Sequence, residues 1–69
     1  MLNEKEIIEL LKKSLEKYIL YLINDSLDYI ICETEIKSYI RVLNREDLKI
    51  RYLDINNARN LLKRILMEV

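Results

Sequence analysis

The pattern of hydrophobic and polar positions changes period along this chain. From Asn3 to about Ile23, apolar residues recur every three or four positions, which predicts an amphipathic helix of five to six turns. Asn3 can cap this helix, and the acidic residues in its first turn suit the positive end of the helix dipole. The loop-forming residues Asn24, Asp25 and Ser26 follow, and we expect the helix to end there.

Between residues 28 and 54 the pattern becomes an alternation. One side of it carries Ile30, Cys32, Thr34, Ile36, Ser38, Ile40 and Val42. After the polar residues 44–47 it resumes, with Leu48, Ile50 and Tyr52 on one side. A period of two is the period of a β-strand. Tested as a helix at 100° per residue, the apolar positions between 27 and 43 scatter around the whole wheel, so we expect strands here.

Three antiparallel strands near 28–33, 35–43 and 48–53 account for this alternation as a meander. Turns around Thr34 and Arg45 keep the apolar faces of these strands together. A single long strand is the alternative for the first two, although the 15 residues from Tyr29 to Leu43 exceed the usual five or six.

The end of the chain returns to a helical period, with Asp54 or Asn56 as the cap of a helix that continues to about Met67. Both helices must cover the apolar face of the sheet, because nothing else can. The predicted fold class is therefore α+β. It is a single two-layer domain over residues 1–69, in the order α-β-β-β-α, with a three-stranded antiparallel meander and both helices on one face.

In the order of its elements and in length, this arrangement resembles the double-stranded-RNA-binding domains. Those domains open their last helix with a run of lysines, where this chain has Asn56, Asn57, Ala58, Arg59 and Asn60. They also use a glycine-containing loop, and this chain has no glycine. The resemblance is one of topology, and we assign no family.

Composition excludes several kinds of chemistry, because the chain has no glycine, proline or histidine and one cysteine. Glycine-rich phosphate loops and the usual zinc sites are excluded. Cys32 has no histidine base and is expected to be a small core residue. Glu33 and Glu35 would lie about 7 Å apart on a strand, but a solvated face gives paired carboxyls no distinct acid–base roles. We expect no enzyme, cofactor or metal.

Three further features favour a cytoplasmic protein without membrane association. A lone cysteine forms no internal disulfide, which fits a reducing compartment. The first residues lack the pattern of a secretory signal. The longest apolar run, residues 18–23, has six residues, whereas a membrane span needs about 20.

The charges sum to zero but are unevenly distributed, with a net −4 over residues 1–35 and a net +4 over residues 36–69. An asymmetry of this kind is a hint about partners. A cationic sheet face with one tyrosine can bind a protein partner or stack on nucleic-acid bases, although charged residues also simply keep strands soluble. The candidate partner-binding residues are Lys37, Tyr39, Arg41, Lys49, Arg51, Arg59 and Lys63.

A domain of this size has little interior for an apolar fraction of 51 %, which favours self-association. The expected contact comprises Tyr18, Leu20, Tyr21 and Ile23, which alternatively complete the core.

Together these features predict a small non-enzymatic module that binds a protein partner and recruits or inhibits it, and that forms homo-oligomers. Inhibitors encoded by phages and other mobile elements are often of this size. The alternative is a nucleic-acid-binding regulator that uses the same basic residues.

Overall fold

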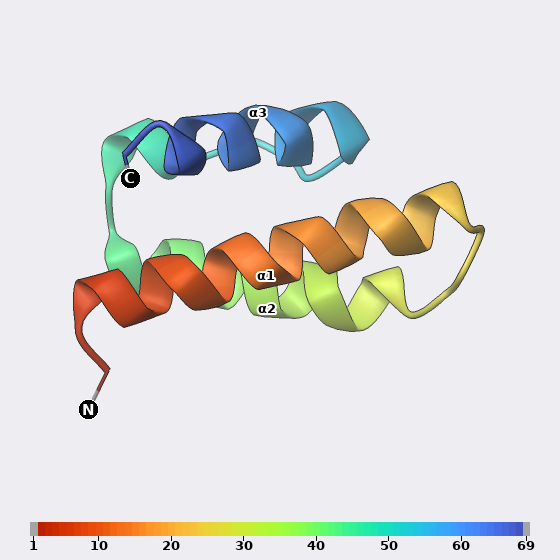
Figure 1. Cartoon of the computed structure of the whole chain (residues 1–69), viewed down its shortest axis with the longest axis horizontal. Helices are drawn as coiled ribbons and strands as arrows, with labels where there is room; N and C mark the ends of the chain where they lie inside the picture. The colour runs from red at the N-terminus through yellow and green to blue at the C-terminus, as the bar shows by residue number, and fades with distance from the viewer. Residues whose placement is uncertain (1, 69) are drawn as a thin grey trace.

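The computed structural model describes residues 2–68, and all the regular secondary structure within this range is helical, with no strand (Figure 1). Three α-helices, α1 (Glu4–Ile23), α2 (Tyr29–Leu43) and α3 (Ile55–Leu66), are joined by turns and one short 3-10 helix, η1 (Glu46–Leu48). The predicted α+β class, with its three-stranded meander, is therefore wrong.

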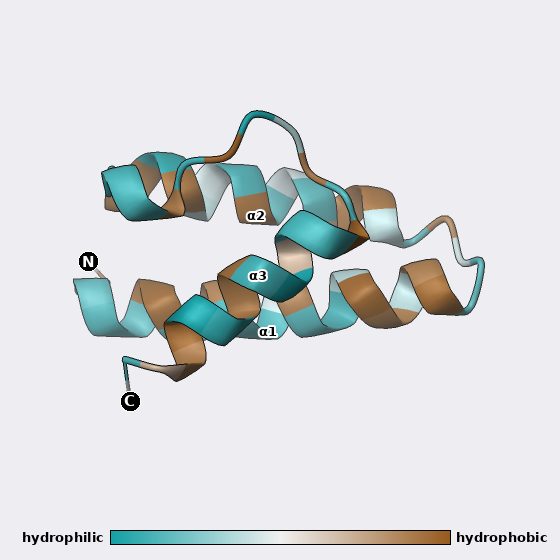
Figure 2. Cartoon of the chain, turned by 90° about the horizontal axis from the view of Figure 1, so that it is seen from above, coloured by the Kyte–Doolittle hydropathy of each residue, from teal (hydrophilic) through white to brown (hydrophobic). Residues whose placement is uncertain are grey.

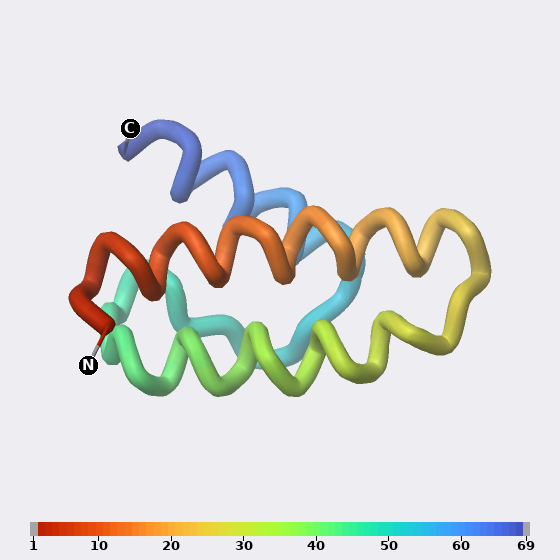
Figure 3. The backbone as a smooth tube through the Cα atoms, turned by 60° about the horizontal axis from the view of Figure 1, so that its bottom comes forward, coloured from red at the N-terminus to blue at the C-terminus, as the bar shows by residue number. Residues whose placement is uncertain are grey.

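Helix α1 is the centre of the arrangement, because both α2 and α3 pack against it. Helices α1 and α2 form an antiparallel hairpin (Figure 3). Helix α3 and the connection that precedes it lie on one side of this hairpin, with α3 crossing α1 and the connection running over α2 (Figure 2). The start of α1 and the end of α3 lie at the same end of the molecule, opposite the α1–α2 turn (Figure 1).

The first and last helices of the chain, α1 and α3, begin and end close to where the sequence predicts. The Asn3 side chain accepts a hydrogen bond from the backbone N–H of Glu6 at 2.9 Å, which caps α1. Asp54, rather than Asn56, caps α3, and its carboxylate accepts from the N–H of Asn57 at 2.7 Å. These bonds satisfy backbone donors that a helix start otherwise leaves unpaired.

The region predicted as the first two strands contains a helical stripe after all. Spacings of three and four residues relate Tyr29, Cys32, Ile36, Ile40 and Leu43, which pack in or against the core. Three other aliphatic residues conceal this stripe, because Ile30, Ile31 and Val42 point outward and are 52 %, 65 % and 65 % exposed. Including them in a helical wheel removes its amphipathic face, so the apparent alternation came from exposed side chains.

The third predicted strand, near 48–53, is also wrong. Leu48 ends η1 and is fully buried, and the residues after it form an irregular connection to α3, with a bend at residues 51–52. A strand needs a neighbouring strand for its hydrogen bonds. Since residues 29–43 are helical, none is present in the described chain, and the topological resemblance to double-stranded-RNA-binding domains disappears with the sheet.

The core forms where the three helices and η1 meet. Tyr18 packs edge-to-face on Tyr29, with ring centroids 6.1 Å apart. The buried apolar residues are Leu11, Leu15, Tyr18, Cys32, Ile36, Ile40, Leu48, Ala58, Leu61 and Ile65.

In the part of the chain that the structure describes, no helix is both long enough and apolar enough to cross a bilayer.

The two aspartates at helix starts provide a matched test of capping. Asp54→Ala should lower the free energy of unfolding by about 1 kcal/mol, because it removes the bond to Asn57. Asp28→Ala, at the start of α2, should change it by only a few tenths of a kcal/mol, since the Asp28 side chain makes no capping bond. Urea unfolding followed by circular dichroism measures both, and equal losses would contradict the assigned caps.

Candidate binding cleft

An open cleft of about 320 Å³ lies between the second half of α2 and the connection that leads to α3. Four of the predicted partner-binding residues line it: Lys37, Arg41, Lys49 and Arg51. All four are exposed, and they are the only charged residues among those that line it. The structure therefore brings together the main part of the basic surface, on a helix and a loop instead of a sheet.

Several contacts hold the wall formed by the connection in place. Leu48, just before it, is buried in the core. The carbonyl of Asp47 accepts a hydrogen bond from the Arg64 side chain at 2.7 Å. The carbonyl of Tyr52 accepts from the Asn57 side chain at 2.9 Å, and that of Leu53 accepts from the Tyr18 hydroxyl at 3.4 Å. A wall fixed in this way loses little conformational entropy when a ligand binds.

The four cations of the cleft differ in their ion pairing. Lys37 lies 3.0 Å from the Glu33 carboxylate, and Lys49 lies 2.9 Å from that of Glu46. Neither Arg41 nor Arg51 has a carboxylate within 4.0 Å in residues 2–68. The two arginines are therefore the cations with unsatisfied charge, and a guanidinium can bind a carboxylate through two parallel hydrogen bonds.

The remaining lining residues make the cleft amphipathic. Ile40 is buried, and Ile50 and Leu53 are half-buried. Tyr52 is 63 % exposed and supplies an aromatic ring beside Arg51. An apolar floor beneath a cationic rim fits a ligand that carries both an aliphatic side chain and negative charge.

Three predicted partner-binding residues lie elsewhere. Tyr39 is half-buried against the core, because its position on α2 faces inward. Arg59 and Lys63 are exposed on α3 and do not line the cleft. Tyr52 was not among the residues predicted to bind a partner, because the alternation assigned it to the apolar face of a strand. Its position next to Arg51 in the sequence is the one signal that could have identified it as a cleft residue.

The residues predicted for self-association divide into two groups. Tyr18 is only 3 % exposed and belongs to the core, and Tyr21 is half-buried against it. Leu20 and Ile23 are 55 % and 58 % exposed near the end of α1. The exposed apolar surface at this end of the hairpin is therefore aliphatic and includes Leu27.

Cys32 is enclosed in the core, and the carboxylate of its neighbour Glu33 is held in an ion pair. Cys32 is buried, and burial raises the pKa of its thiol, with the charge of Glu35 adding to this effect. A raised pKa keeps the thiol protonated and poorly nucleophilic. Glu33 is paired with Lys37. Within residues 2–68, no cluster of three or more cysteine or carboxylate side chains is placed to hold a metal ion.

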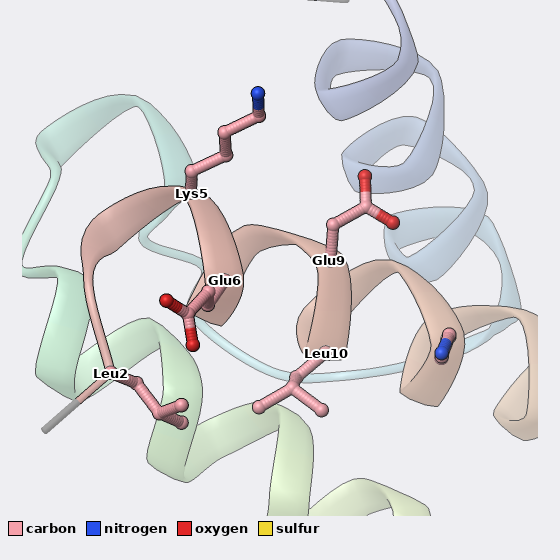
Figure 4. A pocket seen from close by; sticks show the side chains of 6 residues that line it. Leu2, Lys5, Glu6, Glu9 and Leu10 are labelled. Atoms are coloured by element: carbon pink, nitrogen blue, oxygen red, sulfur yellow. The ribbon is translucent and has the colours of Figure 1, made fainter.

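A second hollow, of about 340 Å³, lies along the outer side of the first turns of α1. Leu2 and Leu10 point to one side of it, while Lys5 and Glu9 point away from them (Figure 4). Its charged lining residues are two lysines and two glutamates. This hollow therefore lacks the convergent polar groups that mark a ligand site.

Arg45 forms an ion-pair network that joins three segments. Its guanidinium donates to both carboxylate oxygens of Asp47, at 3.1 and 2.7 Å, and to the carboxylate of Glu68 after α3. Glu4, at the start of α1, lies 3.8 Å away. The hydrogen bond from Arg45 lowers the pKa of Asp47 below its ordinary value.

This network predicts a loss of stability in acid. Because the pKa of Asp47 is lower in the folded than in the unfolded chain, its contribution is present above the unfolded pKa and is lost as pH falls through the folded pKa. The urea midpoint should therefore fall less between pH 7 and about pH 2 in Asp47→Asn than in the wild type. An equal fall in both proteins would show that Asp47 contributes nothing.

No known protein-family model, curated protein or solved structure matches this chain.

Proposed function

We propose that this protein is a small non-enzymatic interaction module of the cytoplasm. It binds an acidic segment of a protein partner in the cleft between α2 and the connection, and thereby recruits or inhibits that partner. The observation that carries the proposal is the cleft itself, whose charged lining residues are all cations and whose floor is apolar. The protonated, buried thiol of Cys32 supports a function without catalysis.

A protein ligand is favoured over nucleic acid by the charges around the cleft. Affinity for nucleic acid comes mainly from neutralising many phosphates, and here two of the four cations already face their own carboxylates. The chain has no net charge to attract a polyanion. The apolar floor also has no role in contacts to phosphates, whereas it accommodates an aliphatic side chain of a peptide.

The test compares tagged wild-type protein with two double variants in pull-downs from host lysate. Arg41→Glu/Arg51→Glu reverses the unpaired charges of the cleft. Arg59→Glu/Lys63→Glu makes the same charge change on α3, away from the cleft. We expect the wild type and the α3 variant to retain the same protein, the cleft variant to lose it, and nuclease to change nothing.

Two results would contradict this proposal. Retention of the same protein by all three baits would show that the cleft is not the binding surface. Loss of every captured protein on nuclease treatment would instead favour the nucleic-acid regulator, as would affinity for a nucleic-acid oligomer that falls steeply with salt.

A further inference from the structure

The turn between α1 and α2 carries an aliphatic side chain and negative charges, the combination that suits the cleft. Leu27 is 76 % exposed there, and it lies between the exposed residues Asp25 and Asp28. The turn thus presents an aliphatic side chain flanked by two carboxylates. The cleft presents the complementary arrangement, an apolar floor flanked by the unpaired guanidinium groups of Arg41 and Arg51.

The turn is also held in one conformation. The backbone N–H of Ser26 donates to the carbonyl of Tyr21 at 2.8 Å, and the Ser26 hydroxyl accepts from the N–H of Asp28 at 3.2 Å. Asp25 adopts the left-handed region with φ 54°, which aspartate tolerates better than most residues. A pre-ordered loop binds with a smaller entropy cost.

We propose that a second copy of this chain occupies the cleft, with the turn of each protomer seated in the cleft of the other. Leu27 then covers Ile40 and Ile50, and the carboxylates of the turn pair with the two arginines. This inference rests on the proposed function, because it names an occupant of the same cleft.

A two-fold axis makes the exchange reciprocal. The turn precedes the first residue of α2, Tyr29, and Arg41 lies 12 residues further along this helix, about 18 Å away. When two α2 helices lie antiparallel, each turn therefore comes opposite the cleft of the partner. Ile30, 52 % exposed, shares a face of α2 with Lys37 and Arg41 through spacings of seven and four, so it becomes covered in the same contact. Such a contact closes as a dimer.

The alternative of two turns meeting directly is disfavoured. It would place Asp25 and Asp28 of one protomer against the same residues of the other, and like charges at an interface repel. The antiparallel arrangement instead pairs opposite charges twice. It also forms two turn–cleft contacts, and a stable interface needs about 800 Å² per partner, more than one small turn supplies.

Occupation by a second copy would regulate the cleft, because the dimer covers the surface that a partner binds. An acidic partner segment then competes with the turn, so partner binding and self-association exclude one another. At a fixed partner concentration, the fraction of this chain that binds the partner should rise as the chain is diluted from dimer to monomer, by mass action.

The experiment uses two variants of opposite charge in sedimentation-equilibrium measurements. The turn variant Asp25→Asn/Asp28→Lys has a basic turn and an unchanged cleft. The cleft variant Arg41→Glu/Arg51→Glu has an acidic cleft and an unchanged turn. We expect the wild type to dimerise and each variant alone to dimerise about tenfold or more weakly, the scale of charge pairs across interfaces. An equimolar mixture should form heterodimers. In these, the basic turn of the first variant meets the acidic cleft of the second, and the acidic turn of the second meets the basic cleft of the first.

A second variant, Leu27→Ser, keeps every charge and should also weaken the dimer, while circular dichroism checks that all variants fold. A wild type that stays monomeric at about 1 mM would overturn the inference, as would a mixture that stays monomeric although the wild type dimerises. Either result leaves the proposed function standing if the pull-down still depends on the cleft arginines. If that dependence is also absent, both fail.

Discussion

Leu15→Ala is expected to lower the free energy of unfolding by about 2–5 kcal/mol, the cost of deleting a fully buried leucine side chain. Leu15 is 0 % exposed and belongs to the core cluster. At roughly 0.05–0.15 kcal/mol per residue, a chain of 69 residues has about 3–10 kcal/mol in total. The substitution therefore removes a large share of the stability and leaves a substantial unfolded population.

The effect should extend to the whole molecule, because Leu15 lies on the helix against which both others pack. A cavity there loosens the contacts of α1 with α2 and with α3 together. We therefore expect one cooperative transition, in which the helical signal and the tyrosine signal are lost at the same urea concentration.

The control is Leu20→Ala, which makes the same chemical change on the same helix at a position that is 55 % exposed. It should alter the free energy of unfolding by less than about 0.5 kcal/mol. Urea unfolding of the wild type and both variants decides the matter. Similar losses in the two variants would mean that α1 does not bury the face described here.

How well the sequence predicts each helix depends on how its apolar residues divide between core and surface. In α1 and α3 most apolar side chains lie on the buried face, so the helical period is visible, and the caps Asn3 and Asp54 mark both starts. In α2 the exposed residues Ile30, Ile31 and Val42 are as hydrophobic as the buried ones. A single sequence does not separate the two classes, and the helical period is lost.

The cationic cluster could be predicted although the fold could not, for a geometric reason. Lys37 and Arg41 are four residues apart, a spacing that places two side chains on one face in a strand and in a helix alike. Tyr39 lies two residues from each, which is the same face in a strand but nearly the opposite face in a helix, and it packs against the core. Folding of the connection over α2 depends on tertiary contacts such as that of Arg64 with Asp47, which local patterns do not contain.

Ser38→Pro should be the most damaging substitution at an exposed position. Ser38 lies inside α2 and is exposed, so its side chain contributes nothing to the core. Proline there removes a backbone hydrogen bond and clashes with the preceding turn, at a cost of about 3 kcal/mol or more. Helical circular dichroism and the urea midpoint should both fall sharply.

Ser38→Ala is the matched control, and its direction separates a helix from a strand. Alanine is favoured over serine inside helices by a few tenths of a kcal/mol, whereas it is depleted in strands. The alanine variant should therefore be slightly more stable than the wild type, and a loss of stability would argue against α2. The pair also tests the cleft, because Lys37, Ile40 and Arg41 flank Ser38 on the same helix. Alanine should leave partner capture intact, and proline should abolish it by displacing the α2 wall of the cleft.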